Sequence, residues 1–230
     1  MTSCVPHSAG AATMVTEPDT LRITEIFLSI QGESTTVGLP TVFVRTTGCP
    51  LRCHYCDTAY AFSGGERLTL DAILARVDDY GVGHVTVTGG EPLAQPTTLR
   101  LLTRLCDAGY RVSLETSGAI DLAGVDFRVM QVVDIKTPAS GEVTRNLWAN
   151  LGHLRAGDQL KFVICDRDDY VWSRARVADM ALAAGVEVLF SPSFETLAGR
   201  TLAEWILADR LSVRLQIQLH KVLWGNEPGR

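Results

Sequence analysis

Apolar positions along the chain follow two alternating spacings. Segments rich in β-branched and aromatic residues, each ending at a polar or glycine-containing turn, predict strands. These strands are residues 23–30, 41–46, 84–88, 111–114, 128–133, 160–164, 186–190 and 213–220. Segments with apolar residues at the 3.6-residue period predict helices at 70–80, between Pro96 and Gly109, at 168–184 and at 202–209.

The order of these elements indicates the fold class. Strands that alternate with helices form a parallel sheet, and ligands of such α/β folds bind where the strands end. A partial (β/α) barrel with a reduced set of helices fits best, because residues 119–125 and 139–158 show no convincing helical period. Thr69 is expected to cap the first helix.

The last predicted strand alternates strictly between apolar and polar residues. In a strand the two kinds face opposite ways. The polar row is Arg214, Gln216, Gln218 and His220. Two interpretations remain open. The segment is either an edge strand with one solvent-exposed face, or a strand whose polar row lines the lumen of a nearly closed barrel.

Composition indicates one domain and a small-molecule ligand. The chain has 230 residues, of which 46% are hydrophobic and 20% charged, enough for a single hydrophobic core at residues 21–230. Residues 1–20 show no periodicity and are expected to form a disordered tail. The net charge of −5 argues against binding to nucleic acid.

The sequence also bears on location. No apolar run is long enough to span a membrane, and residues 1–20 lack the pattern of a secretory signal. The six cysteines show no disulfide-like pairing, which suits a reducing cytoplasm. We therefore expect a cytoplasmic protein without a membrane partner.

Three cysteines dominate the candidate chemistry. Cys49, Cys53 and Cys56 lie in one short segment, residues 49–58, here called the cysteine loop. Three thiolates suit either zinc or an iron–sulfur cluster. A four-iron cubane held by three cysteines keeps one iron open for a small chelating ligand. A zinc knuckle or three incidental thiols are the alternatives.

The spacing of the three cysteines resembles the signature of the radical S-adenosylmethionine (SAM) superfamily. The resemblance implies a [4Fe–4S] cluster whose open iron binds SAM and a partial barrel of the radical SAM type. Asp57-Thr58, together with Gln31-Gly32-Glu33, resembles the 7-carboxy-7-deazaguanine synthase family. This second resemblance covers residues 23–225, nearly the whole chain.

The resemblance also implies which residues bind SAM. The turn from Thr88 to Pro92 reads Thr-Gly-Gly-Glu-Pro, in which the glycines allow close approach of the backbone and a carboxylate can grip an ammonium group. The implied SAM contacts are Tyr55, Cys56, Asp57, Gly90, Ile135, Lys136, Thr137, Ser191, Pro192, Ser193 and Phe194. Asp134-Ile135-Lys136 departs from the Ser-Pro-Lys that is commoner in the family, and Ser191-Pro192 replaces Gln-Pro.

Further residues are implied to hold the substrate and a metal ion. Thr58 matches a Mg2+ ligand of the family, and its alternative role is a hydroxyl that caps the turn after Cys56. Arg45 would bind a carboxylate of the substrate, although it could also be a surface arginine. The implied substrate contacts are Ile30, Gln31, Gly32, Glu33, Arg45, Thr88 and His220.

The resemblance predicts a radical SAM lyase. It would convert 6-carboxy-5,6,7,8-tetrahydropterin to 7-carboxy-7-deazaguanine with loss of ammonia, in queuosine (7-deazapurine) biosynthesis. A homodimer and an electron donor such as flavodoxin are expected partners, and the sequence shows no obvious catalytic base. The alternatives are an activase that installs a glycyl radical on a partner protein and a non-catalytic metal or iron–sulfur protein.

Overall fold

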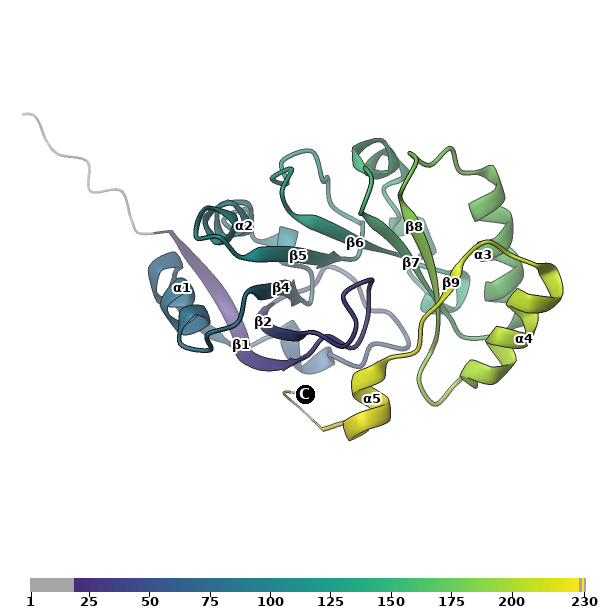
Figure 1. Cartoon of the computed structure of the whole chain (residues 1–230), viewed down its shortest axis with the longest axis horizontal. Helices are drawn as coiled ribbons and strands as arrows, with labels where there is room; N and C mark the ends of the chain where they lie inside the picture. The colour runs from purple at the N-terminus through teal and green to yellow at the C-terminus, as the bar shows by residue number, and fades with distance from the viewer. Residues whose placement is uncertain (1–18, 228, 230) are drawn as a thin grey trace, which may run out of the picture.

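A computed structural model of the chain describes residues 19–227 and 229. Within this part, nine strands form one sheet in the order β3-β1-β2-β4-β5-β6-β7-β8-β9 (Figure 1). The strands are β1 Thr20–Ile30, β2 Pro40–Thr46, β3 Glu66–Thr69, β4 His84–Gly89, β5 Arg111–Thr116, β6 Met130–Ile135, β7 Gln159–Ile164, β8 Glu187–Pro192 and β9 Arg214–Leu215. From β2 through β9 every pairing is parallel, and β1 runs antiparallel to both β2 and β3.

The sheet is a curved, open row with β3 and β9 at its edges. The predicted partial (β/α) barrel is therefore confirmed. The described helices are α1 Leu70–Asp78, α2 Thr98–Asp107, α3 Arg167–Asp179, α4 Gly199–Asp209 and α5 Leu219–Trp224. In Figure 1, α5 lies apart from the other four helices. No helix among the described residues is long and apolar enough to cross a membrane.

The reduced set of helices is also confirmed. No α-helix joins β5 to β6, and three short 3₁₀ turns at Pro138–Ser140, Val143–Arg145 and Trp148–His153 lie between β6 and β7. Buried asparagines stabilise these segments. Asn146 exchanges hydrogen bonds with the backbone of Lys136 at 2.8 Å in both directions, and Asn150 donates to the Gly118 carbonyl at 3.0 Å. Side-chain amides thus satisfy backbone groups that helices would otherwise pair.

The boundaries of the elements differ from the predictions at several points. β1 begins at Thr20, inside the predicted tail, while residues 1–18 of that tail lie outside the described residues. The short strand β3 was not predicted, and β6 lies two residues later than expected. Thr69 does cap α1, because its Oγ1 accepts a hydrogen bond from the Ala72 amide at 3.2 Å.

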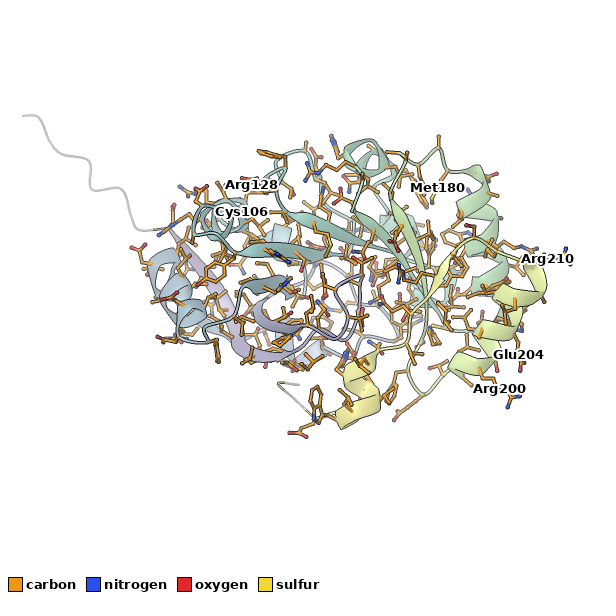
Figure 2. The ribbon with its side chains drawn as sticks, viewed as in Figure 1. Cys106, Arg128, Met180, Arg200, Glu204 and Arg210 are labelled. Atoms are coloured by element: carbon orange, nitrogen blue, oxygen red, sulfur yellow. The ribbon has the colours of Figure 1, made fainter. Side chains whose placement is uncertain are left out.

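The prediction of a helix through residue 184 is wrong, since α3 ends at Asp179. Met180, labelled in Figure 2, is the C-cap residue of this helix, and its backbone angles are extended. An extended chain places side chains two residues apart on one face. Met180 and Leu182 are both partly buried and pack against the core. Packing of alternate residues therefore outweighs helical propensity at this point.

The prediction of a strand over residues 213–220 is wrong beyond Leu215. The chain there turns toward the loop after β1, and the Leu219 amide donates to the Gly32 carbonyl at 2.9 Å. Gln216 exchanges hydrogen bonds of 2.8 and 3.0 Å with the backbone of Ser34. The backbone then forms α5, which carries His220. Polar side chains alternate here because they bind a loop, not because a further strand pairs with them.

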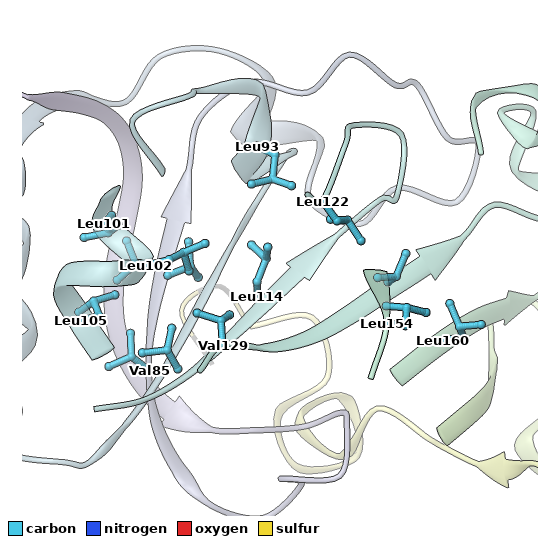
Figure 3. Packing of buried hydrophobic residues seen from close by; sticks show 14 of the residues in the cluster. Val85, Leu93, Leu101, Leu102, Leu105, Leu114, Leu122, Val129, Leu154 and Leu160 are labelled. Carbon is cyan, nitrogen blue, oxygen red and sulfur yellow. The ribbon is translucent and has the colours of Figure 1, made fainter. Parts of the chain in front are cut away.

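The core lies between the sheet and helices α1 to α4. Leu101, Leu102 and Leu105 of α2 are fully buried and pack in the same cluster as Val85 of β4 (Figure 3). Burial of each such leucine stabilises the fold by roughly 1.5–3 kcal/mol. The helices therefore hold the sheet from outside and leave the ends of its strands free to build a site.

Candidate active site

A cavity of about 560 Å³ lies where the central strands end. Residues of β1, β2, β4, β5, β6, β7 and β8 line it, together with the cysteine loop and α5. Most of the predicted site residues share this one cavity. They are Ile30, Gln31, Glu33, Arg45, Cys49, Cys53, Tyr55, Cys56, Asp57, Thr58, Thr88, Gly90, Lys136, Ser191, Pro192, Ser193, Phe194 and His220.

Three predicted site residues do not line the cavity. Ile135 is 4% exposed and belongs to the hydrophobic core. Thr137 is fully buried, and its hydroxyl hydrogen-bonds to Asp169 at 3.0 Å. Gly32 lies behind His220, because a Cβ on Gly32 would fall 2.0 Å from Nδ1 of that histidine. Gly32 therefore makes room for His220.

The cysteine loop is held by its own backbone and by the 3₁₀ turns after β6. The His54 amide donates to the Ser140 carbonyl at 3.0 Å, and the Arg52 amide donates to Glu142 at 2.6 Å. Burial raises the pKa of the Cys49 and Cys53 thiols. Burial therefore favours the protonated thiols. A bound metal favours the deprotonated form instead, because the thiolate is the ligand that it binds.

The three cysteines line one cavity and could each supply a thiolate to a cluster. Within the described part of the chain, no three histidine, cysteine or acidic side chains converge as the ligands of one metal ion would. In a cubane each thiolate binds a different iron, so the sulfurs need not meet at one point. Cys106 on α2 and Cys165 after β7 do not line the cavity. Cys4 lies outside the described residues.

The glycine-rich turn after β4 contacts the cysteine loop directly. A Cβ on Gly90 would lie 2.3 Å from the Gly48 carbonyl oxygen and 2.7 Å from Cβ of Cys49. The Glu91 amide donates to the same Gly48 carbonyl at 2.8 Å. Glycine is thus required here because two backbones touch.

The expectation that a carboxylate of this turn grips an ammonium group does not hold for Glu91. Its side chain is fully buried and accepts hydrogen bonds from the Leu93 amide at 3.0 Å, the Ser117 amide at 2.7 Å and the Thr116 hydroxyl at 3.0 Å. The Ser117 hydroxyl donates as well. Glu91 therefore joins the turn after β4 to the end of β5.

Two polar groups of the cavity are left for a ligand. Within the described residues, the Tyr55 hydroxyl and Asp134 Oδ1 are buried without a hydrogen-bond partner. The other carboxylate oxygen of Asp134 pairs with Lys136 at 3.1 Å. Because buried polar groups without partners are costly, these atoms indicate a polar ligand. A polar cofactor such as SAM fits beside the cysteines on this basis.

A second polar cluster lines the cavity around Glu33. Lys161 of β7 forms an ion pair with Glu33, and Gln218 donates to Glu33 at 2.7 Å. Burial opposes the charge on both partners, but their attraction prevails. It lowers the pKa of Glu33 and raises that of Lys161. Lys161 was not predicted, although a charged residue amid the apolar positions of 160–164 was a usable signal.

Glu115 near the end of β5 also faces the cavity and was not predicted. It accepts hydrogen bonds from Thr88 at 3.0 Å and from Gln31 at 3.4 Å. Burial and the nearby charge of Glu33 raise the pKa of Glu115, and Lys161 offsets this only in part. The only hint in the sequence was its place at the end of a strand.

Thr58 does not act as a turn cap. It occupies the N-cap position of the 3₁₀ turn Ala59–Phe62, but its side chain makes no capping hydrogen bond. Its hydroxyl donates to Asp57 at 2.7 Å, and Asp57 lies 3.4 Å from Lys221 of α5. Burial opposes ionisation of Asp57, yet Thr58 and Lys221 together lower its pKa. Oxygen ligands suited to Mg2+ therefore lie beside the thiolates.

His220 reaches the cavity from α5 instead of from a strand. Burial lowers its pKa, so the imidazole is neutral near pH 7. Arg45 also lines the cavity, from β2, and pairs with Glu25 at 2.6 Å. The structure thus places Arg45 and His220 around one cavity, as expected.

The fold and the cysteine loop define a radical SAM protein. Residues 43–126 match the model of the Radical SAM superfamily. The crystal structure of QueE from Escherichia coli superposes with a TM-score of 0.74 at 23% identity, covering 87% of this chain and 95% of that one. SuiB of Streptococcus suis bound to its precursor peptide SuiA superposes with a TM-score of 0.56 at 11% identity, covering 79% of this chain and 49% of that one.

Proteins with similar sequences place the chain in one family within this superfamily. The 7-carboxy-7-deazaguanine synthase of Chlorobaculum tepidum is 44% identical over 89% of this chain and 94% of the relative. The synthase of Koribacter versatilis is 43% identical over 90% and 98%, and that of Thermoplasma acidophilum 39% over 90% and 99%. The chain belongs to the 7-carboxy-7-deazaguanine synthase family.

Family membership decides between the alternatives that the cysteines left open. Radical SAM enzymes carry a [4Fe–4S] cluster and use SAM, so the predictions of cluster and cofactor are confirmed. The glycyl-radical activase and the non-catalytic zinc or iron–sulfur protein are not supported by these relatives.

Proposed function

We propose that this protein catalyses the ring contraction of 6-carboxy-5,6,7,8-tetrahydropterin to 7-carboxy-7-deazaguanine with loss of ammonia, a step of queuosine biosynthesis. One observation supports it most: the three cysteines share a cavity with a polar array built by Arg45 and His220. This array suits a small, polar, carboxylated heterocycle. The relatives that share this chain's family carry the name of this activity.

The cysteines and the residues around them would hold the cofactors. Cys49, Cys53 and Cys56 would bind three irons of the cluster, while Tyr55 and Ser191, which line the same cavity, would contact SAM. When bound, the cluster and SAM supply a 5′-deoxyadenosyl radical that abstracts hydrogen from the substrate. The chain's own residues orient the ring and exclude water.

The opposite side of the cavity would bind the pterin. Arg45 would form a charge-assisted hydrogen bond with its carboxylate, and neutral His220 would contact the ring. Gln31 and Glu33 also line the cavity and would offer an amide and a carboxylate to the polar edge of the ring. Thr58 would be one ligand of a Mg2+ ion whose other ligands are water and substrate oxygens.

The assembly and environment are part of the proposal. Exposed apolar side chains on and before α5, among them Ile217 and Val222, suit a homodimer. A one-electron donor such as flavodoxin would reduce the cluster. The described cysteines are free thiols, which suits the cytoplasm. Light scattering coupled to size exclusion would measure the assembly.

The experiment is anaerobic incubation of the reconstituted enzyme with SAM, a reductant and the carboxypterin, followed by mass spectrometry. We expect 7-carboxy-7-deazaguanine from the wild type. Cys53→Ala should lower the iron content and abolish SAM cleavage, because one corner of the cluster loses its ligand. Cys106→Ala is the matched control and should keep both. SAM cleavage that persists in Cys53→Ala would contradict the assignment.

A further inference from the structure

The pairing of β1 with β2 places the carboxylate of Glu25 beside Arg45. Glu25 of β1 and Arg45 of β2 are partners in the antiparallel pairing of these strands. Their side chains meet through Arg45 Nε and Glu25 Oε1 at 2.6 Å, with 15% of Arg45 and 23% of Glu25 exposed. Side chains of directly opposed residues lie on the same face, so the backbone itself imposes this contact.

Tyr60 completes the group. Its hydroxyl donates to the same Glu25 oxygen at 2.7 Å. The Tyr60 side chain is half exposed, and a tyrosine hydroxyl is a hydrogen-bond donor at neutral pH. The Arg45 guanidinium carbon lies 6.0 Å from the ring centroids of both Tyr60 and Phe27. Arg45 is thus held by a carboxylate and by two aromatic rings.

Only Arg45 of this trio lines the cavity. Glu25 engages Nε, and among the described residues no hydrogen bond is made by Nη1 or Nη2 of Arg45. Guanidinium presents its donors in a fixed planar fork, so a partner at Nε fixes the direction in which the Nη groups point. The two Nη groups can then bind both oxygens of an incoming carboxylate.

We propose that Glu25 and Tyr60 are positioning residues that orient Arg45 toward the carboxylate of the substrate. This inference rests on the proposed function, in which Arg45 binds that carboxylate. Tyr60 also lies two residues after Thr58, so the segment that supplies the proposed Mg2+ ligand helps to fix the carboxylate-binding arginine.

The competing role for Glu25 is simple neutralisation of Arg45. The two roles predict effects of opposite sign. A neutralising carboxylate weakens the attraction of Arg45 for the substrate, so its removal would tighten binding. A positioning carboxylate restricts Arg45 to its binding geometry, so its removal would loosen binding. Glutamine keeps an oxygen that can accept from Nε and from Tyr60, which separates geometry from charge.

The test measures binding to reconstituted holoenzyme with SAM and Mg2+, using the fluorescence of two probes. One is 6-carboxypterin and the other is pterin without the carboxylate. Glu25→Ala should weaken binding of 6-carboxypterin about tenfold, the loss expected for a charge-assisted hydrogen bond whose donor is no longer oriented. Binding of pterin and of SAM should be unchanged. Glu25→Gln should restore most of the affinity, and Tyr60→Phe should lie between them.

Glu66→Ala is the matched control, because Glu66 lies on the neighbouring strand β3 and forms an exposed ion pair with Arg76 of α1. It should leave all three affinities unchanged. Melting temperatures identify variants that fold poorly, and Glu25→Gln keeps the test valid if Glu25→Ala does not fold. Tighter binding by Glu25→Ala, or equal losses in the Ala and Gln variants, would overturn the inference.

The same measurement in an Arg45→Ala background separates the inference from the proposed function. Glu25→Ala should add no further loss there, because its effect passes through Arg45. A loss that persists would overturn the positioning role while leaving Arg45 in place as the carboxylate ligand. If Arg45→Ala alone leaves the affinity for 6-carboxypterin unchanged, the role of Arg45 in the proposed function fails, and the inference fails with it.

Discussion

At the scale of single residues, the cysteine loop places soft and hard ligands next to each other. The Cys56 thiol and the Thr58 hydroxyl are separated by one residue and line the same cavity. Thiolates select iron, whereas hydroxyl and carboxylate oxygens select Mg2+. Two inorganic partners can therefore bind in one short segment without competing for ligands.

Thr58→Val tests the hard ligand, because valine keeps the shape of threonine and removes its oxygen. We expect the Mg2+ concentration for half-maximal activity to rise about tenfold, as is typical when a metal site loses a supporting oxygen. Iron content should stay the same. Thr103→Val on α2 is the matched control, since Thr103 does not line the cavity and its hydroxyl donates to the Leu99 carbonyl at 3.2 Å. Unaltered Mg2+ dependence in Thr58→Val would remove Thr58 from the site.

At the scale of elements, the cavity depends on two close backbone contacts. The turn after β4 touches the cysteine loop at Gly90, and the loop after β1 touches α5 at Gly32. The first contact places the cysteines, and the second places His220. Both involve segments distant in sequence, so each needs a glycine on one side to let the chains approach.

Gly90→Ala should displace the cysteine loop. The new Cβ would overlap the Gly48 carbonyl oxygen, which is backbone and cannot rotate away. We expect a loss of roughly 1–3 kcal/mol in the free energy of unfolding, typical of overpacking, together with lower iron content after reconstitution. Gly83→Ala is the control, because nothing lies within 4 Å of its Cβ position. Normal iron content in Gly90→Ala would show that the contact does not position the cysteines.

Gly32→Ala should weaken substrate binding and leave SAM binding and the iron content unchanged. Its Cβ would overlap both the His220 ring and the His220 backbone nitrogen, at 2.0 and 2.9 Å. Binding of 6-carboxypterin should weaken about tenfold, because even a small misplacement of a contact residue is costly. SAM binding and iron content should match those of the Gly83→Ala control. An equal loss of SAM affinity would place Gly32 and His220 in a different part of the site.

At the scale of the whole molecule, the buried charges of the cavity join strands that are far apart in the sheet. Glu33 follows β1 and Lys161 lies on β7, 128 residues apart in sequence. Gln218, just before α5, binds the same carboxylate. The open sheet is therefore bridged within the cavity by one ion pair and its hydrogen bonds.

Lys161→Ala should leave Glu33 buried without its ion-pair partner and Glu115 with less positive charge nearby. Loss of one member of a buried pair costs about 3–5 kcal/mol, which urea unfolding at pH 7.5 would measure. In the wild type the pKa of Glu33 is lowered, so its contribution to stability is present above the unfolded pKa and is lost as the pH falls. The deficit of Lys161→Ala should therefore shrink toward pH 4. A deficit that is constant with pH would indicate lost packing alone.

Local patterns in the sequence determined the alternation of strands and helices, the open barrel and the cysteine loop. The period of each element and the spacing of the three cysteines are properties of short segments, so they can be interpreted without the fold. The same holds for Thr69, whose capping bond reaches only three residues along the chain.

Only the tertiary structure decided the contacts on which the cavity depends. Glu25 lies behind Arg45 because of the register between β1 and β2, and Lys161 meets Glu33 because the sheet curves. Residues 216–220 alternate like a strand, yet they bind the loop at 32–34 and lead into α5. Such pairings depend on which distant backbone groups come into reach, and no local period of the sequence carries that information.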